Sequence, residues 1–235
     1  MTPRLQTTVI LAMTADGKIA DFHRHPARFS SSNDQAHLEQ QISLVDAVLI
    51  GANTLRAYGT SLPITEAQLL TSRKQQGKAP QPIHIICSTH AEIDPNLRFF
   101  QQPIPRWLLT TTRGAKQWQE VTYTGFDRII IAEAIAADIK SIDWLAAWTQ
   151  FSALGLGKLA ILGGGELVAS LLELDLIDEL WLTICPVIFG GKTAPTPVEG
   201  TGFLASAAKK LELLHVENTG GEVFLHYRVK LNLIL

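Results

Sequence analysis

Short hydrophobic runs, separated by polar and glycine-rich segments, recur along most of this chain. The first run, residues 7–12, ends at the turn-like Ala15-Asp16-Gly17, and this pattern predicts a buried strand. Runs of the same kind predict further strands at residues 46–50, 83–87, 107–111, 128–132, 159–162 and 179–184.

Helical spacing appears between several of these runs. Ser32-Asn33-Asp34-Gln35 has the form of a capping box with Ser32 as the N-cap, and Leu38, Ile42 and Val45 follow at helical intervals. We expect further helices within residues 141–154 and 166–174. Residues 59–82 are rich in Gly, Pro, Ser, Thr and Gln, which favours a long loop with one short helix near residues 66–70.

The last third of the chain changes character. Residues 222–231 alternate between apolar and polar side chains, which is typical of an antiparallel strand at an edge or interface. Lys209 and Lys210 are expected on a solvated helix face. The chain therefore alternates strands with helices and ends in antiparallel strands. This order predicts an α/β fold with a mixed, mostly parallel sheet. No repeat or composition break divides the chain, so we expect one domain, residues 1–235.

Composition excludes several classes of protein. The chain has 235 residues, of which 46% are hydrophobic and 18% charged, and its net charge is -2, so no nucleic-acid-binding surface is indicated. No apolar run approaches the roughly 20 residues of a membrane span, and the N-terminus lacks the pattern of a signal peptide. Cys87 and Cys185 lie inside apolar runs, which favours buried, reduced thiols and a cytoplasmic location.

Three consecutive glycines, Gly163-Gly164-Gly165, separate a predicted strand from a predicted helix. A strand that passes through residues without side chains into a helix N-terminus presents bare N–H groups to an anion such as a dinucleotide pyrophosphate. A plain tight turn is the alternative. The segment is not a Rossmann fingerprint, since that pattern requires glycine where the chain has Val168.

Other common motifs fail on spacing. Gly190-Gly191-Lys192-Thr193 lacks the earlier glycine of a P-loop, where Pro186 stands, and the prolines that follow exclude the required helix. His23 and His25 have no carboxylate or cysteine set near them in sequence, so no metal site is predicted.

Three further segments follow predicted strands, where sheet ends commonly hold ligands. Thr14–Ala20 combines an Asp-Gly turn with Lys18, 51–54 presents backbone N–H groups and a hydroxyl, and 110–113 combines threonines with an arginine suited to an anion. Each is also compatible with an ordinary loop.

Taken in chain order, these segments resemble the riboflavin-biosynthesis reductase domain. This is the dihydrofolate-reductase-like, C-terminal half of the bifunctional pyrimidine deaminase/reductase. The resemblance spans roughly residues 7 to 230 and rests on Ala12-Met13-Thr14-Ala15-Asp16-Gly17-Lys18-Ile19-Ala20, Asp46-Ala47-Val48-Leu49-Ile50-Gly51-Ala52-Asn53-Thr54, Ile161-Leu162-Gly163-Gly164-Gly165-Glu166-Leu167, Asp178-Glu179-Leu180 and Pro186-Val187-Ile188-Phe189-Gly190-Gly191.

The resemblance implies a dihydrofolate-reductase-like fold, a homodimer and NADPH as hydride donor. The implied substrate is a ribosylamino-pyrimidinedione 5′-phosphate, which is reduced at the ribose to a ribitylamino chain. Lys18 and Asp16 are the implied catalytic residues, and Ser31, Arg56 and Arg73 the implied substrate-binding residues. The implied cofactor-binding residues are Ala12, Ile19, Gly51, Thr54, Ser88, Thr110, Thr111, Leu162, Gly163, Gly164, Gly165, Glu166 and Leu167.

The chain departs from the family pattern at two places. Tyr58 and Gly163 stand where the family has acidic residues, so the exact substrate and the activity stay open on sequence grounds. The alternatives are a reductase of the same fold that acts on another pterin or pyrimidine, and a non-catalytic dinucleotide-binding protein. The preference between NADPH and NADH and the stereochemistry of hydride transfer are also left open.

Overall fold

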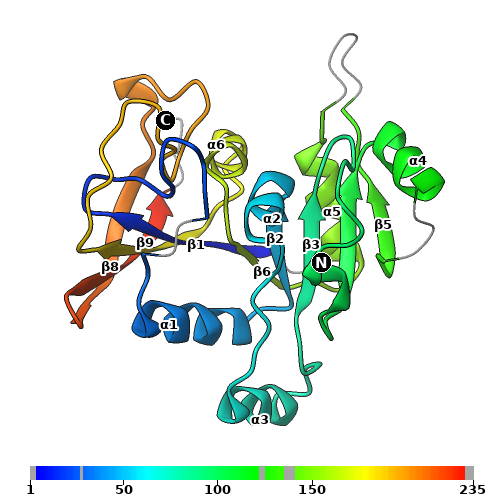
Figure 1. The fold of residues 1–235 in the computed structure, drawn as a ribbon, viewed down its shortest axis with the longest axis horizontal. Helices are drawn as coiled ribbons and strands as arrows, with labels where there is room; N and C mark the ends of the chain where they lie inside the picture. The colour runs from blue at the N-terminus through cyan, green and yellow to red at the C-terminus, as the bar shows by residue number, and fades with distance from the viewer. Residues whose placement is uncertain (1–3, 27–28, 122–124, 135–140, 231–235) are drawn as a thin grey trace. The chain divides into compact units, whose positions relative to one another are not determined.

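The computed structural model describes residues 4–26, 29–121, 125–134 and 141–230 (Figure 1). Its strands are β1 (Gln6–Thr14), β2 (Ala47–Gly51), β3 (Ile83–Cys87), β4 (Arg106–Thr110), β5 (Arg128–Ile131), β6 (Lys158–Ile161), β7 (Glu179–Cys185), β8 (Lys210–Thr219) and β9 (Glu222–Lys230). Its helices are α1 (Ser32–Ser43), α2 (Ala52–Tyr58), α3 (Ala67–Gln75), α4 (Thr112–Val121), α5 (Trp144–Ala153) and α6 (Gly165–Glu173). Two short 3-10 turns are η1 (Arg98–Gln101) and η2 (Ala205–Ala207).

The strands form a mixed, mostly parallel sheet in the order β5-β4-β3-β2-β6-β1-β7-β9-β8, which confirms the predicted fold class. The chain divides into two compact units, Met1–Leu5 with Ile42–Leu159 and Gln6–Gln41 with Ala160–Leu235, and strand β6 contributes residues to both. The expectation of one domain, residues 1–235, stays a prediction. No helix among the described residues is both long and apolar enough to cross a bilayer.

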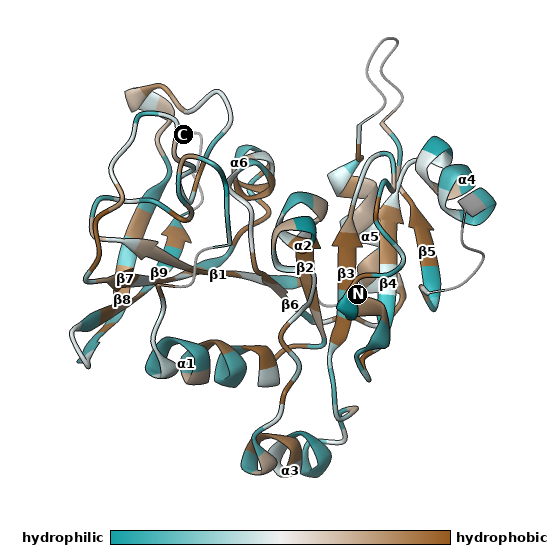
Figure 2. Cartoon of the chain, viewed as in Figure 1, coloured by the Kyte–Doolittle hydropathy of each residue, from teal (hydrophilic) through white to brown (hydrophobic). Residues whose placement is uncertain are grey.

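The first unit is built on parallel pairing of β2 with β3, β3 with β4, and β4 with β5. Strands β3 and β4 are hydrophobic over most of their length (Figure 2). Ile85, Ile86, Leu108 and Leu109 of these strands are completely buried, because a sheet of this kind is covered on both faces. Asp46, just before β2, accepts hydrogen bonds from Lys78 Nζ and from the backbone N–H groups of Gly157 and Lys158 at the start of β6. These bonds hold the starts of β2 and β6 together.

The second unit pairs β1 with β7 in parallel and then adds the antiparallel strands β9 and β8. Helix α1 packs on this sheet through His37, whose ring lies 4.6 Å from that of Trp181 and 4.9 Å from that of Phe224. Helix α6 contributes Leu167, Val168 and Leu171 to the core.

Three expectations from the sequence were wrong in detail. Helix α1 is capped by Ser31 rather than Ser32, because the N–H groups of Asn33 and Asp34 donate to Ser31 Oγ at 3.0 and 3.3 Å. The helix expected near residues 66–70 extends to Gln75. Lys210 begins strand β8 instead of lying on a helix.

Strand β9 is not an edge strand, because the unexpected strand β8 pairs with its outer side. A β-bulge at Leu213/His215 interrupts the alternation of β8, which explains why the period-two pattern was not apparent there. Leu231, the last residue expected in the alternating strand, lies outside the described residues, as do Met1, Thr2 and Pro3.

Candidate functional site

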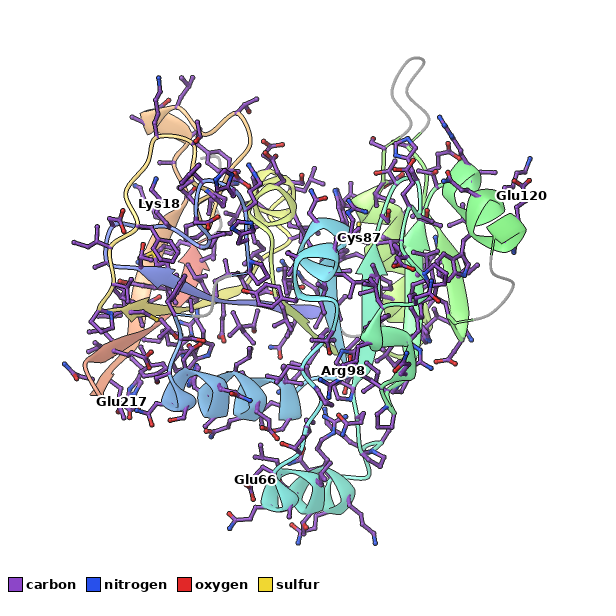
Figure 3. All side chains as sticks on the ribbon, viewed as in Figure 1. Lys18, Glu66, Cys87, Arg98, Glu120 and Glu217 are labelled. Atoms are coloured by element: carbon purple, nitrogen blue, oxygen red, sulfur yellow. The ribbon has the colours of Figure 1, made fainter. Side chains whose placement is uncertain are left out.

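Lys18 sits in a rigid turn directly after β1, in the second unit (Figure 3). Its backbone N–H donates to Thr14 Oγ1 at 2.9 Å and its carbonyl accepts from Thr14 N at 2.8 Å. Gly17 closes the turn with a φ of +78°, which favours glycine. Among the described residues, no carboxylate forms an ion pair with the Lys18 ammonium.

Asp16 holds this turn against the loop that follows β7. Its carboxylate accepts hydrogen bonds from Thr14 Oγ1 at 2.6 Å, Gly190 N at 2.7 Å and Phe189 N at 3.2 Å. The bond from Thr14 is the largest cause of a lowered pKa for Asp16. A carboxylate of this kind carries no proton near neutral pH. The geometry therefore favours a positioning role for Asp16, and a catalytic role for Lys18 stays a prediction.

The three glycines link β6 to helix α6 as the sequence predicted. Gly164 occupies the N-cap position with no side-chain cap, and the first intrahelical bond runs from Val168 N to the Gly164 carbonyl. The N–H groups of the first turn therefore point out of a positive helix end. Gly163 has a φ of +98°, and a Cβ there would lie 3.2 Å from Leu11 Cδ2 of β1.

Gly165 permits a very close approach between α6 and the loop after β7. A Cβ at Gly165 would lie 2.3 Å from the carbonyl oxygen of Thr196 and 2.8 Å from Glu199 Cγ, so no other residue fits without movement. The N–H of Glu199 donates to the Gly165 carbonyl at 3.2 Å. Glu199 also pairs with Arg24 at 3.0 Å, which connects the loop before α1 to this segment.

The other predicted cofactor residues of the second unit lie in β1, in the turn after it, and next to the glycines in sequence. Ala12 is half-buried in β1, opposite Thr183 of β7, and Ile19 N donates to the Pro195 carbonyl at 3.0 Å. Leu162 is half-buried before the glycines, and Glu166 is exposed in the first turn of α6. Leu167 is buried in the core. Contact of these residues with a cofactor stays a prediction.

Ser31 is bound on all sides by the protein. Its hydroxyl lies 2.5 Å from Glu222 Oε2 and its N–H donates to Glu222 Oε1 at 3.0 Å, while its oxygen caps α1. A serine hydroxyl has one donor and two acceptor positions, and all are used here. Direct binding of substrate by this hydroxyl is therefore not favoured.

The predicted residues Gly51, Thr54 and Arg56 lie together in the first unit. Gly51 ends β2 and is the N-cap of α2 without a side-chain cap, and Thr54 lies in the first turn of that helix. Arg56 is exposed and donates to the carbonyl of Glu92 at 2.7 Å and to Asn53 Oδ1 at 2.5 Å. Its role at a substrate phosphate stays a prediction.

Ser88, Thr110 and Thr111 are buried where β3 and β4 end. Ser88 Oγ accepts from Ala91 N at 3.0 Å, and Thr110 and Thr111 both donate to the Thr89 carbonyl, at 3.4 and 2.8 Å. These hydroxyls shape the loops at the strand ends. Contact with a cofactor stays a prediction and would involve the backbone that they position.

Arg73 was expected to bind substrate, but the structure places it in the protein interior. It is 2% exposed, and its guanidinium donates to the backbone carbonyls of Ala79, Ser43 and Val45, each at 2.8 Å. These hydrogen bonds connect α3 to the end of α1. Because the guanidinium is buried, it is not accessible to a substrate phosphate. Burial lowers its pKa, as expected for a cation removed from water.

Both cysteines are free, and burial raises the pKa of each thiol to about 12, so neither is a nucleophile near neutral pH. Among the described ranges, no group of three or more His, Cys, Asp or Glu side chains is arranged to hold a metal ion.

The mixed, mostly parallel sheet that ends in the antiparallel strands β9 and β8 defines an α/β protein of the dihydrofolate-reductase-like fold class. The chain belongs to the RibD C-terminal domain family, whose model matches residues 7–225.

Similar proteins agree with this assignment. The 2,5-diamino-6-ribosylamino-4(3H)-pyrimidinone 5′-phosphate reductase of Archaeoglobus fulgidus is 27% identical over 214 residues, covering 90% of this chain and 92% of that protein. A pyrimidine reductase-like protein from Corynebacterium diphtheriae has a TM-score of 0.81 at 19% identity, with 97% and 93% of the two chains covered. Dihydrofolate reductase from Enterococcus faecalis, complexed with NADP(H), shares the fold at a TM-score of 0.50 and 13% identity, with 97% and 99% covered.

Sequence reasoning included Thr14 in the segment Thr14–Ala20 without giving it a role, and it missed Glu199 and Glu222. Thr14 acts through local contacts with Asp16 and Lys18, whereas Glu199 acts through Arg24, which is distant in sequence. The burial of Glu222 could have been predicted from the sequence. Glu222 lies two positions before Phe224 in β9, so both side chains point to the same, buried face of the strand. A carboxylate in the inward phase of a strand predicts a buried polar contact.

We predict that Gly165→Ala lowers the free energy of unfolding by about 2 kcal/mol, the range of overpacked sites, although alanine favours helices. The cause is the overlap with the Thr196 carbonyl. Urea unfolding measures this change. Gly157→Ala is the matched control, since its Cβ would lie 3.4 Å from Asp46 Oδ2. Equal unfolding free energies for the two variants would contradict the proposed constraint.

Proposed function

We propose that this chain is an NADPH-dependent reductase that converts a ribosylamino-pyrimidine 5′-phosphate into the ribitylamino product in riboflavin biosynthesis. The observation that carries the proposal is the family match across residues 7–225, together with the lysine turn after β1 and the glycine-capped α6 in the family's order. Relatives named as reductases of such a phosphate support the same reaction.

The relatives' names favour the 2,5-diamino-pyrimidinone form of the substrate. The deaminated uracil form has the same ribose and phosphate, so the reacting centre is identical. An assay with both compounds therefore tests the reaction and the pyrimidine preference together.

A nicotinamide dinucleotide is proposed at the glycine segment, because α6 begins at Gly164 without a side-chain cap and its first turn is a positive helix end. The N–H groups at the start of α6 would hold the diphosphate. Bound NADPH supplies a hydride to the C1′ carbon of the ribose. We propose NADPH rather than NADH on the resemblance of the chain to its family.

Lys18 supplies the proton that the reaction consumes. As the C1′–O4′ bond of the ribose ring breaks and a C1′–H bond forms, the ring oxygen gains a proton and becomes the 4′-hydroxyl. The ammonium of Lys18 donates this proton, since the turn that carries it is fixed by Thr14 and Asp16. The lysine charge also stabilises the negative charge that develops on the oxygen.

Steady-state oxidation of NADPH and NADH, followed by absorbance with each pyrimidine phosphate, tests the proposed function. We expect turnover with at least one of the two phosphates and none with dihydrofolate. Turnover with a pterin alone would replace the proposed substrate. Tight dinucleotide binding without turnover on any of these compounds would contradict a catalytic role.

We predict that Lys18→Ala lowers kcat by about 100-fold or more, the usual contribution of a positioned proton donor. The Kd for NADPH, measured by fluorescence titration, should stay within about threefold of the wild-type value, because the diphosphate site is separate. Lys192→Ala, an exposed lysine in the loop after β7, is the control. Unchanged kcat for Lys18→Ala would remove Lys18 from the mechanism.

We also propose that the chain forms a homodimer through strand β8. This strand ends the described strand order, and its Leu211, Leu213 and Val216 are 43%, 51% and 54% exposed. An exposed, apolar edge strand pairs readily with a second copy of itself. The resemblance to the family supports the same assembly.

We predict that the double substitution Leu213→Lys and Val216→Lys raises the dimer dissociation constant by about 100-fold or more, because it places charges in the apolar centre of the interface. Sedimentation equilibrium measures this constant. Leu145→Lys, at a 58% exposed position of α5, should leave it unchanged. A wild-type protein that is monomeric at micromolar concentration would contradict the proposal.

A cytoplasmic location is the final part of the proposal. Two free cysteines support it, since unpaired thiols are typical of reducing compartments. Recovery of the protein outside the cytoplasmic fraction of disrupted cells would contradict it.

A further inference from the structure

Glu222 is a carboxylate buried at the start of β9, where it is 2% exposed. Three donors converge on it, namely Ser31 N at 3.0 Å, Ser31 Oγ at 2.5 Å and Cys185 Sγ at 3.5 Å. An ionised carboxylate accepts hydrogen bonds only, so this donor set suits the charged form. Both Glu222 oxygens therefore accept hydrogen bonds from Ser31, and Oε1 also accepts one from Cys185 in strand β7.

Asp34, in the first turn of α1, is a second buried carboxyl group near Glu222, at 7% exposure. It is hydrogen-bonded to the side chains of Thr183 and Ser30. Burial and the charge of Glu222 both raise the pKa of Asp34. Among the described residues, no cation forms an ion pair with either group. Two charges buried in this cluster would cost more desolvation than one.

The segment held by Glu222 is connected to the lysine turn. Phe29 packs edge-on against Phe189 with ring centroids 5.3 Å apart. The N–H of Phe189 donates to Asp16, which also binds Thr14 in the turn that presents Lys18. A continuous set of contacts therefore runs from Glu222, through the segment before α1, to the proton donor.

We propose that Glu222 is a positioning residue for the reaction, and that it places residues 29–34 against the Lys18 turn through its two hydrogen bonds to Ser31. This inference rests on the proposed function and gives Ser31 a structural role in substrate placement. Asp34 belongs to the same buried cluster, where its carboxyl group is hydrogen-bonded to Thr183 and Ser30. Cys185 is the remaining titratable group that faces Glu222, and its raised pKa keeps it protonated.

Glu222→Gln tests the inference, because glutamine keeps the size of the side chain but cannot accept from both Ser31 groups. We expect the KM for the pyrimidine phosphate to rise about tenfold, the effect of losing one hydrogen bond to a charged group. The affinity for NADPH should be unchanged. The control is Glu217→Gln on β8, which removes a 59% exposed carboxylate and should change KM by less than about twofold. Lys18 and Glu217 lie at different ends of the second unit (Figure 3).

Hydrogen exchange separates this inference from the proposed function. The amides of Ser31, Asn33 and Asp34 should exchange faster in Glu222→Gln than in the wild type, whether or not a substrate is known. Should Glu222→Gln fail to fold, Glu222→Asp, which shortens the reach to Ser31, is measured in the same way. Unchanged exchange and unchanged KM would overturn the inference, while an inactive wild type with faster exchange in the variant would overturn only the proposed function.

The pH profile gives a readout that a purely structural role would not change. Asp34 has a folded-state pKa above its ordinary value of 3.8, so its stabilising contribution is present below pH 3.8 and is lost as the pH rises through the raised value. Ionisation then places a second charge beside Glu222 and loosens the segment. We expect the KM of the wild-type protein for the pyrimidine phosphate to rise as the pH passes through the raised pKa of Asp34. The KM of Asp34→Asn should not change over the same pH range. Parallel profiles for the two proteins would contradict the role given to Asp34.

Discussion

The close approach of the Thr196–Glu199 loop to the first turn of α6 is the constraint on which the candidate site depends. Any side chain at Gly165 would overlap the Thr196 carbonyl, and Gly164 leaves the helix end without a side-chain cap. The backbone N–H groups of the first turn are then the donors that the helix itself offers at that end. A positive helix end of this kind favours a bound diphosphate.

Two carboxylates, one exposed and one buried, organise the rest of the second unit. The exposed Asp16 accepts hydrogen bonds from the lysine turn and from the loop after β7, and the buried Glu222 accepts them from the segment before α1 and from β7. At Glu222 the carboxylate satisfies donors in a buried position, where an unpaired donor would be costly. The position of Lys18 therefore follows from side chains that do not themselves need to touch a substrate.

Local patterns predicted much of the fold and part of the site. Apolar runs located β1 to β7 to within about two residues, because a strand buried on both faces requires continuous apolar side chains. Alternation of apolar and polar residues located β9. Strand β8 was not predicted, because the bulge at Leu213/His215 interrupts its alternation of apolar and polar residues. The lysine turn and the glycine segment were visible because they depend on neighbouring residues. The burial of Arg73 and the enclosure of Ser31 by Glu222 arise from tertiary contacts, which no local pattern encodes.

A crystal structure of the protein with bound NADPH tests the central claim most directly. The account predicts that diphosphate oxygens accept hydrogen bonds from the N–H groups of Gly165, Glu166 and Leu167, with no side chain between them and the helix. A diphosphate bound elsewhere, with the start of α6 covered by other groups, would contradict it.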